Sequence, residues 1–142
     1  MCDGIYFEYQ GNILRMYFPN SKAMLPVQKK DGSLILMPWG RRQKQSGLLP
    51  MGGWARLDSI YSGRWDKYFP KPLKIPALSF MEKDFEGQSH WYDLNKGQYL
   101  QGLLARENNE QRIYIVTIEP ELEDANIHSR WPRVIQNGEQ SK

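Results

Sequence analysis

The sequence predicts a β-dominated α+β domain, and three observations lead to this prediction. Apolar, β-branched and aromatic residues gather in short runs that turn residues separate, which is typical of strands. Nine Pro and twelve Gly are scattered along 142 residues, so the elements should be short. Helical patterns are weak and few. The length suits a single domain, which we expect to span residues 1–135, with a polar tail over 136–142.

Six segments have the composition of strands. Five of them combine apolar, β-branched and aromatic residues, and they cover 4–10, 13–18, 33–37, 98–105 and 112–118. The last is almost fully apolar from Ile113 to Ile118, which predicts a central, buried strand. A sixth strand is expected over 73–81, with Pro76 at an edge or a bulge because proline has no N–H to donate.

Two segments, 59–68 and 121–127, are predicted to form short helices. Pro120 stands before the second one and acidic residues follow it, an arrangement that is favoured in a first helical turn. With so little helix, strands should supply most of the core of one compact domain.

Composition argues against several classes of protein. A single cysteine rules out an intramolecular disulfide, which fits a reducing cytoplasm, and two histidines are too few for a Cys/His zinc cluster. We therefore expect no metal and no cofactor. No long apolar run and no signal-peptide pattern is present, so we expect a soluble, cytoplasmic protein that does not bind membranes.

The charge distribution favours a polyanionic partner. The net charge is +3, and basic residues concentrate between Arg41 and Lys74, whereas acidic residues gather later, around Glu119 to Asp124. Aromatic residues are interleaved with the basic ones, as in many nucleic-acid-binding surfaces. An ordinary solvated surface is the alternative, and composition alone does not exclude it.

The position of Cys2 makes an unusual reaction possible. If Met1 is removed, Cys2 carries both a free α-amine and a thiol on adjacent carbons. The amine condenses with an aldehyde to an imine, and the thiol then attacks the imine carbon to close a five-membered thiazolidine ring. Both groups are partly available as nucleophiles near neutral pH. The dipeptide alone favours the alternative, an incidental cysteine.

Two further side chains are candidates for proton transfer. Glu82 follows the apolar residues Phe80-Met81, and a carboxyl group at the end of a buried strand can have a raised pKa. His128 precedes a turn that contains Pro132, and histidine readily exchanges protons near neutrality. A solvated acid and a structural histidine are the respective alternatives.

Trp39, Trp54 and Arg56 stand in Gly- and Pro-rich loops. Indole rings beside arginines suit base stacking and phosphate contact along a single strand of nucleic acid. The alternative is that the tryptophans close the ends of a small β core.

Together these segments form an ordered series of short motifs. The series consists of Met1-Cys2, Pro38-Trp39-Gly40, Trp54-Ala-Arg-Leu-Asp-Ser59, Ile75-Pro-Ala-Leu-Ser-Phe-Met-Glu82, Gln101-Gly-Leu103, Ile115-Val-Thr117 and Ile127-His-Ser-Arg-Trp-Pro132. The series resembles the SOS response-associated peptidase (SRAP) family over residues 1–135. Trp54 stands where the family has Asn, Lys83 where it usually has Trp, and the chain is short, as in a compact branch of the kind that a phage carries.

The resemblance implies a fold and a function. It implies an α+β fold with a barrel-like antiparallel core, and a covalent crosslink between the N-terminal Cys2 and abasic sites in single-stranded DNA. Glu82 and His128 correspond to the active-site acid and histidine of the family, and Arg56 to its DNA-contacting arginine. On this reading Arg41, Arg42 and Arg130 neutralise phosphates, and Trp39 and Trp54 stack on bases.

Two other functions stay open. Cys2, His128 and Glu82 can also form the nucleophile, base and orienting acid of a thiol autopeptidase. A chain that has lost the chemistry would instead be a non-catalytic module that binds single-stranded DNA.

Overall fold

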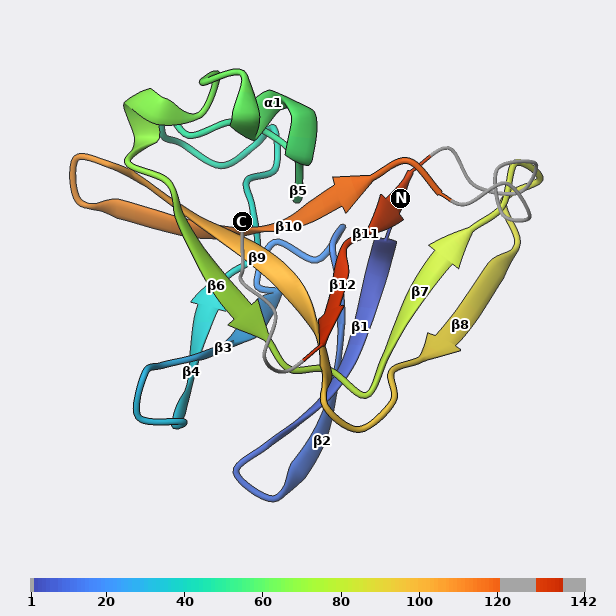
Figure 1. The fold of residues 1–142 in the computed structure, drawn as a ribbon. Helices are drawn as coiled ribbons and strands as arrows, with labels where there is room; N and C mark the ends of the chain where they lie inside the picture. Colours follow the sequence, from blue (N-terminus) through green and yellow to red (C-terminus); the bar gives the residue numbers. More distant parts are fainter. Residues whose placement is uncertain (1, 121–129, 137–142) are drawn as a thin grey trace.

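The computed structural model describes residues 2–120 and 130–136 (Figure 1). Strands dominate this part of the chain, and its helices are α1 (Leu57–Tyr61) and the 3-10 helix η1 (Asp66–Tyr68). The predicted helix at 121–127, His128 and the tail beyond 136 lie outside the described residues.

The described strands form two sheets. The first is antiparallel, and its order is β2 (Asn12–Tyr17), β1 (Cys2–Tyr9), β7 (Ser79–Lys83) and β8 (Ser89–Asp93). The order of the second is β11 (Trp131–Pro132), β10 (Glu110–Ile118), β9 (Gln98–Glu107), β6 (Lys71–Ile75), β3 (Met24–Gln28) and β4 (Leu34–Pro38). Two short strands extend the second sheet: β12 (Val134–Gln136) pairs with β9, and β5 (Trp54–Arg56) runs parallel to β10.

The sheets are not closed into a barrel, so the barrel-like core implied by the family resemblance is corrected. At one point β3 meets β6 through a single register pair, Gln28 with Lys74. Directly after β4, an isolated bridge between Trp39 and Ile113, instead of a ladder, joins the chain to β10. Ladders this short leave openings between the strands instead of a continuous hydrogen-bonded wall.

The two faces of β9 and β10 are both buried, each in its own hydrophobic cluster. One face contributes Leu100, Leu104, Ile113 and Ile115 to a large cluster, which also contains Ile5, Phe7 and Phe80 of the first sheet. The other face contributes Leu103, Ala105, Tyr114 and Val116 to a smaller cluster, which α1 and η1 cover. Alternating side chains of the same strands therefore join the two halves of the core.

Most predicted elements agree with the structure, and two differ. The strands expected at 4–10, 13–18, 33–37, 98–105 and 112–118 correspond to β1, β2, β4, β9 and β10. The strand expected at 73–81 is wrong, because Pro76 falls between β6 and β7, which belong to different sheets. The helix expected at 59–68 is interrupted at Gly63, whose φ of +87° is left-handed and incompatible with a continuing helix.

Candidate active site

The backbone of Cys2 lies directly opposite Glu82. Antiparallel pairing of β1 with β7 gives the register Cys2 to Glu82 and then Gly4 to Met81, so the register shifts at Asp3. Such a bulge bends a strand and changes which residues face each other. The fold thus brings the backbone of the predicted nucleophile to the predicted acid, although 79 intervening residues separate them in sequence.

Glu82 has a fully buried side chain at the end of β7. Burial raises the pKa of its carboxyl group to about 7, because a low-dielectric environment disfavours the charged form, and the negative charge of Asp3 acts in the same direction. A carboxyl group with this pKa is partly protonated at neutral pH. It can therefore both donate and accept a proton, which is what general acid–base chemistry requires.

His90 adds a third residue, on a third strand, to the pair of Cys2 and Glu82. It pairs with Glu82 across β7 and β8, so Cys2, Glu82 and His90 occupy neighbouring positions on β1, β7 and β8. The His90 Nε2 atom lies 2.8 Å from the Asp84 Oδ2 atom, and this hydrogen bond lowers the pKa of Asp84. Sequence analysis did not select His90; the only signal was an aromatic-rich run, Ser89–Asp93, shortly after Glu82.

An aromatic cluster closes the core beside this row. The ring of Trp131, from β11, lies with its centroid 5.3 Å from that of Phe80 and 4.9 Å from that of Tyr92. Phe80 and Tyr92 are themselves stacked across β7 and β8. Trp131 therefore anchors the end of the second sheet next to the strands that carry Glu82 and His90. His128, the third predicted catalytic residue, lies outside the described residues.

The predicted DNA-binding arginines have different environments. Arg56 is exposed and forms an ion pair with Asp58, in which Nη2 and Oδ2 are 2.8 Å apart. Arg130 is buried instead: its Nη2 donates to the Thr117 carbonyl oxygen over 2.8 Å, and burial lowers its pKa. Arg56 pairs in register with Thr117, so both arginines belong to the same end of β10.

A shallow depression borders Arg56. Its volume is about 460 Å³, and its lining consists of Arg56, Asp58, Ser59, Ser62 and Arg64. Two arginines and two hydroxyl groups suit a phosphate group. An exposed ion pair such as that of Arg56 with Asp58 is weak, so a phosphate can displace the carboxylate.

Arg41 and Arg42 donate to backbone carbonyl oxygens, Arg41 within its own loop and Arg42 also to Phe18, which follows β2. Arg41 Nε donates to the Leu49 carbonyl oxygen over 2.6 Å. Arg42 Nε donates to the Phe18 carbonyl oxygen over 2.6 Å, and burial lowers the pKa of Arg42 to about 10. Both side chains hold the loop after β4 in place, and the described contacts give no support to their assignment as phosphate ligands.

The structure corrects the assignment of Trp39 to base stacking. Its side chain has no exposed surface, and its Nε1 donates to the Gly53 carbonyl oxygen over 3.0 Å. Base stacking is therefore excluded in this conformation, and Trp39 takes the alternative role of closing the core. Trp54 is partly buried and packs on Phe18, with ring centroids 4.8 Å apart.

An aromatic surface that sequence analysis did not identify lies on the outer face of the first sheet. Trp91 forms edge contacts with Tyr6 and Tyr17, with centroids 6.4 and 6.3 Å apart. The guanidinium of Arg15 lies 5.0 Å from the Tyr6 ring centroid. We call these four residues the outer aromatic surface; exposed rings beside an arginine are a platform for nucleic-acid bases.

The fold and these polar residues define a β-dominated protein in which Glu82, a buried carboxyl group with a raised pKa, lies on β7 opposite the start of β1. No protein-family model and no curated protein matches the chain. The family resemblance therefore rests on the motifs alone and stays a prediction.

Two findings bear on possible ligands. Among residues 2–120 and 130–136, no group of three or more His, Cys, Asp or Glu side chains is arranged to hold a metal ion. In the same ranges, no helix has the length and hydrophobicity needed to cross a membrane.

Proposed function

We propose that this chain captures abasic sites in single-stranded DNA through Cys2, once Met1 has been removed. The observation that carries the proposal is the register pair between Cys2 and Glu82, which combines the predicted nucleophile with a buried carboxyl group of pKa about 7. Covalent capture of an aldehyde needs a group of this kind, because a proton must be given and then taken back within one reaction.

The proposed reaction releases one water molecule. The Cys2 amine attacks the aldehyde carbon of the ring-opened sugar and forms a carbinolamine. Protonated Glu82 gives its proton to the departing oxygen, which leaves as water, and an iminium that keeps the nitrogen-bound proton remains. The Cys2 sulfur then adds to the iminium carbon, the electron pair of the C=N bond moves to the nitrogen, and the thiol proton passes to the Glu82 carboxylate. The product is a thiazolidine, and Glu82 returns to its starting state.

Two regions support the DNA part of the proposal. Arg56 and its depression offer a phosphate contact near the end of β10. The outer aromatic surface offers rings for stacking, and β1, which contributes Tyr6 to this surface, also carries Cys2. His128 keeps its proposed role as a second proton donor.

The test is denaturing electrophoresis of the purified chain after incubation with abasic single-stranded DNA. We expect a heat-stable shifted band for the wild type. The C2A variant keeps an N-terminal amine but has no thiol, so its adduct should stop at the imine. A band that appears for C2A only after borohydride reduction would support this order of steps.

Glu82 has a matched control in Glu86, an exposed glutamate in the turn after β7. We expect E82Q to slow adduct formation by about 100-fold or more, the usual contribution of a positioned acid–base group, and E86Q to leave the rate unchanged. The absence of a band with wild-type protein of confirmed Cys2 N-terminus would refute the proposal, as would equal rates for E82Q and E86Q. Reversible, salt-sensitive binding alone would identify a non-catalytic module.

Intact-mass measurement separates the autopeptidase alternative from the proposal. Met1 that is absent from the wild type but retained when Glu82 is replaced would show that the chain removes its own first residue. Loss of Met1 from both proteins would assign the removal to another enzyme.

A further inference from the structure

A groove opens between the β3–β4 hairpin and the β6–β9 pair. Its volume is about 710 Å³, within the roughly 300–1,000 Å³ range of small-molecule sites. The groove exists because β3 and β6 share only the pair Gln28 with Lys74, and the two strands separate beyond it. In Figure 1, β3, β4 and β6 lie on one side of the molecule, and β7 and β8, the strands that carry Glu82 and His90, lie on the other.

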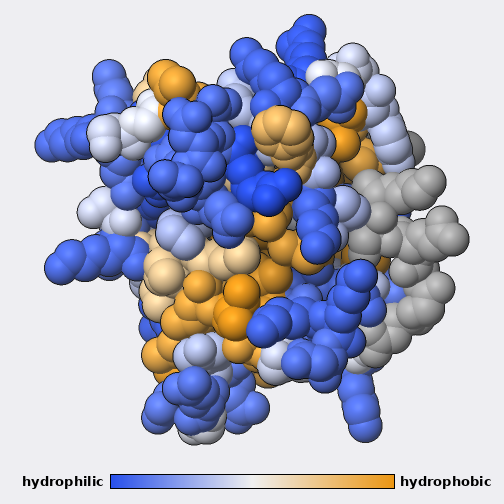
Figure 2. Space-filling model, turned by 90° about the vertical axis from the view of Figure 1, so that its left-hand side faces the viewer, coloured by the Kyte–Doolittle hydropathy of each residue, from blue (hydrophilic) through white to orange (hydrophobic). Residues whose placement is uncertain are grey.

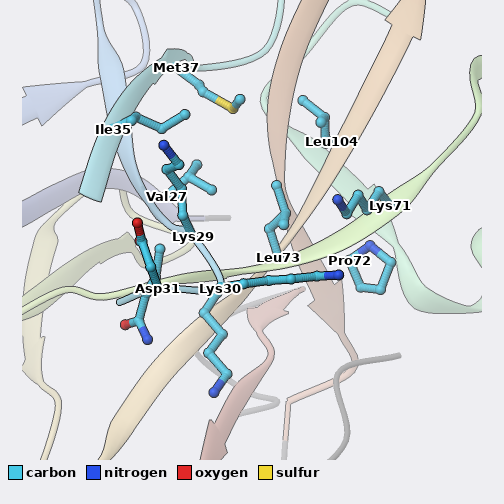
Figure 3. A pocket seen from close by; sticks show the side chains of 12 residues that line it. Val27, Lys29, Lys30, Asp31, Ile35, Met37, Lys71, Pro72, Leu73 and Leu104 are labelled. Atoms are coloured by element: carbon cyan, nitrogen blue, oxygen red, sulfur yellow. The ribbon is translucent and has the colours of Figure 1, made fainter. Parts of the chain in front are cut away.

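The floor of the groove is aliphatic. Val27, Ile35 and Met37 come from the hairpin and face Leu73 and Leu104 of β6 and β9 across the cavity (Figure 3). Val27 and Leu104 belong to the large core cluster, so the groove is an opening onto the core itself. The described residues that line it include no aromatic side chain.

The rim of the groove is basic. Lys29, Lys30, Lys71 and Lys74 line the edge of this floor, with the Lys74 Nζ atom 4.8 Å from the Tyr99 ring centroid, and Asp31 is the only acid among the described lining residues. Asp31 Oδ1 already accepts hydrogen bonds from the backbone N–H and the hydroxyl group of Ser33, over 2.9 and 2.6 Å. Figure 2 shows this side of the molecule, where a hydrophobic area is bordered by hydrophilic side chains. We call the feature the lysine-rimmed groove.

We propose that the lysine-rimmed groove binds a monomeric anionic amphiphile, a long-chain carboxylate. Its alkyl chain would lie on the aliphatic floor, where burial removes apolar surface from water, and its head group would pair with the lysines. A nucleic acid fits less well, because the groove offers no ring on which a base can stack. A small inorganic anion would leave the floor unused. This site is independent of the proposed reaction at Cys2.

The test is calorimetric titration of the full chain with sodium dodecanoate, below its micellar concentration. We expect saturable binding of one molecule per chain. Each methylene removed should weaken binding by up to about fourfold, so octanoate should bind as much as about 250-fold more weakly. Dodecyltrimethylammonium has the same alkyl chain with a positive head group and should not bind.

Lysine variants test the basic rim of the groove. The double variant K71E/K74E should weaken dodecanoate binding by about tenfold or more, because charged hydrogen bonds are lost and repulsion replaces them. K96E removes an exposed lysine in the turn between β8 and β9 and should leave the affinity unchanged. If K71E/K74E does not fold, methyl NMR of the wild type still tests the site: dodecanoate should shift the Ile35 and Leu73 signals.

Four outcomes would overturn the proposal. The first two are equal affinities for octanoate and dodecanoate, and binding of inorganic phosphate as tight as that of dodecanoate. The third is binding of the chain to anionic lipid vesicles without binding to monomeric dodecanoate. The fourth is displacement of bound dodecanoate by undamaged single-stranded DNA. The last two would assign the groove to a membrane surface and to nucleic acid, respectively. Unchanged Ile35 and Leu73 signals at saturation would place the ligand elsewhere.

Discussion

Replacing Glu82 with glutamine isolates the free energy of ionising a buried carboxyl group. The pKa of Glu82 is raised from 4.5 to about 7 in the folded chain, because its side chain is fully buried. At pH 4 the carboxyl group is mostly protonated in the folded and unfolded states alike. As the pH rises from 4.5 to 7, the unfolded state loses this proton before the folded state does, so the native state binds more protons and stability falls.

The size of this loss in the free energy of unfolding follows from the shift in the pKa of Glu82. A difference of about 2.5 pKa units corresponds to about 3 kcal/mol at 25 °C, all of it lost by about pH 7 to 8. A glutamine of nearly the same shape carries no such penalty. We therefore expect E82Q to gain up to about 3 kcal/mol over the wild type at pH 8, relative to the difference between the two proteins at pH 4.

Urea unfolding followed by tryptophan fluorescence at pH 4, 5.5 and 8 measures this difference. With a typical m-value of about 1–3 kcal/mol/M, the gain shifts the midpoint of E82Q by about 1–3 M between the extremes of pH. The exposed control E86Q should stay within about 0.5 kcal/mol of the wild type. A difference between E82Q and the wild type that is the same at pH 4 and pH 8 would refute the raised pKa of Glu82.

Three other substitutions test the packing. W39A should lower the free energy of unfolding by about 3–5 kcal/mol, whereas W91A, which removes a partly exposed ring, should cost about 1 kcal/mol; equal losses would contradict the burial of Trp39. Y114F removes a hydroxyl group that donates to a carbonyl oxygen over 2.6 Å and should cost about 1 kcal/mol by urea unfolding, with exposed Y61F as the control without effect. G102A places a methyl group 2.7 Å from an isoleucine side chain and should lower the thermal midpoint by an amount equivalent to about 1–3 kcal/mol; an unchanged midpoint would show that the core yields without strain.

Strands with continuous apolar patterns could be predicted from the sequence, and short or irregular ones could not. β9 and β10 are long and buried on both faces, so their composition alone indicates them. The sequence did not indicate β3, because Pro26 argues against a strand. The structure accommodates Pro26 because β6 pairs with β3 only at Gln28, so no hydrogen bond of the ladder is lost at the proline. β11 and β12 are two and three residues long, which is too short for any pattern to appear.

Site residues could be predicted where local sequence decides the environment. Glu82 follows an apolar run on its own strand, and its burial and raised pKa agree with the expectation. His90 was missed because only the pairing of β7 with β8 brings it opposite Glu82. Trp39 and Arg42 stand in a loop of ordinary appearance, and their inward orientation depends on contacts with Phe18 and Gly53, which come from elsewhere in the chain.

The two-sided burial of β9 and β10 determines where the fold is hardest to open. Their hairpin is local in sequence, so it can form early, and both hydrophobic clusters then assemble on it. The backbone amides of Leu103 and Tyr114 should therefore be among the last to exchange with deuterium, whereas those at the start of β1 should exchange early through fraying. The chain would thus carry its proposed reactive residue, Cys2, on the part of the fold that opens most readily, while the rigid β9–β10 hairpin keeps each opening local.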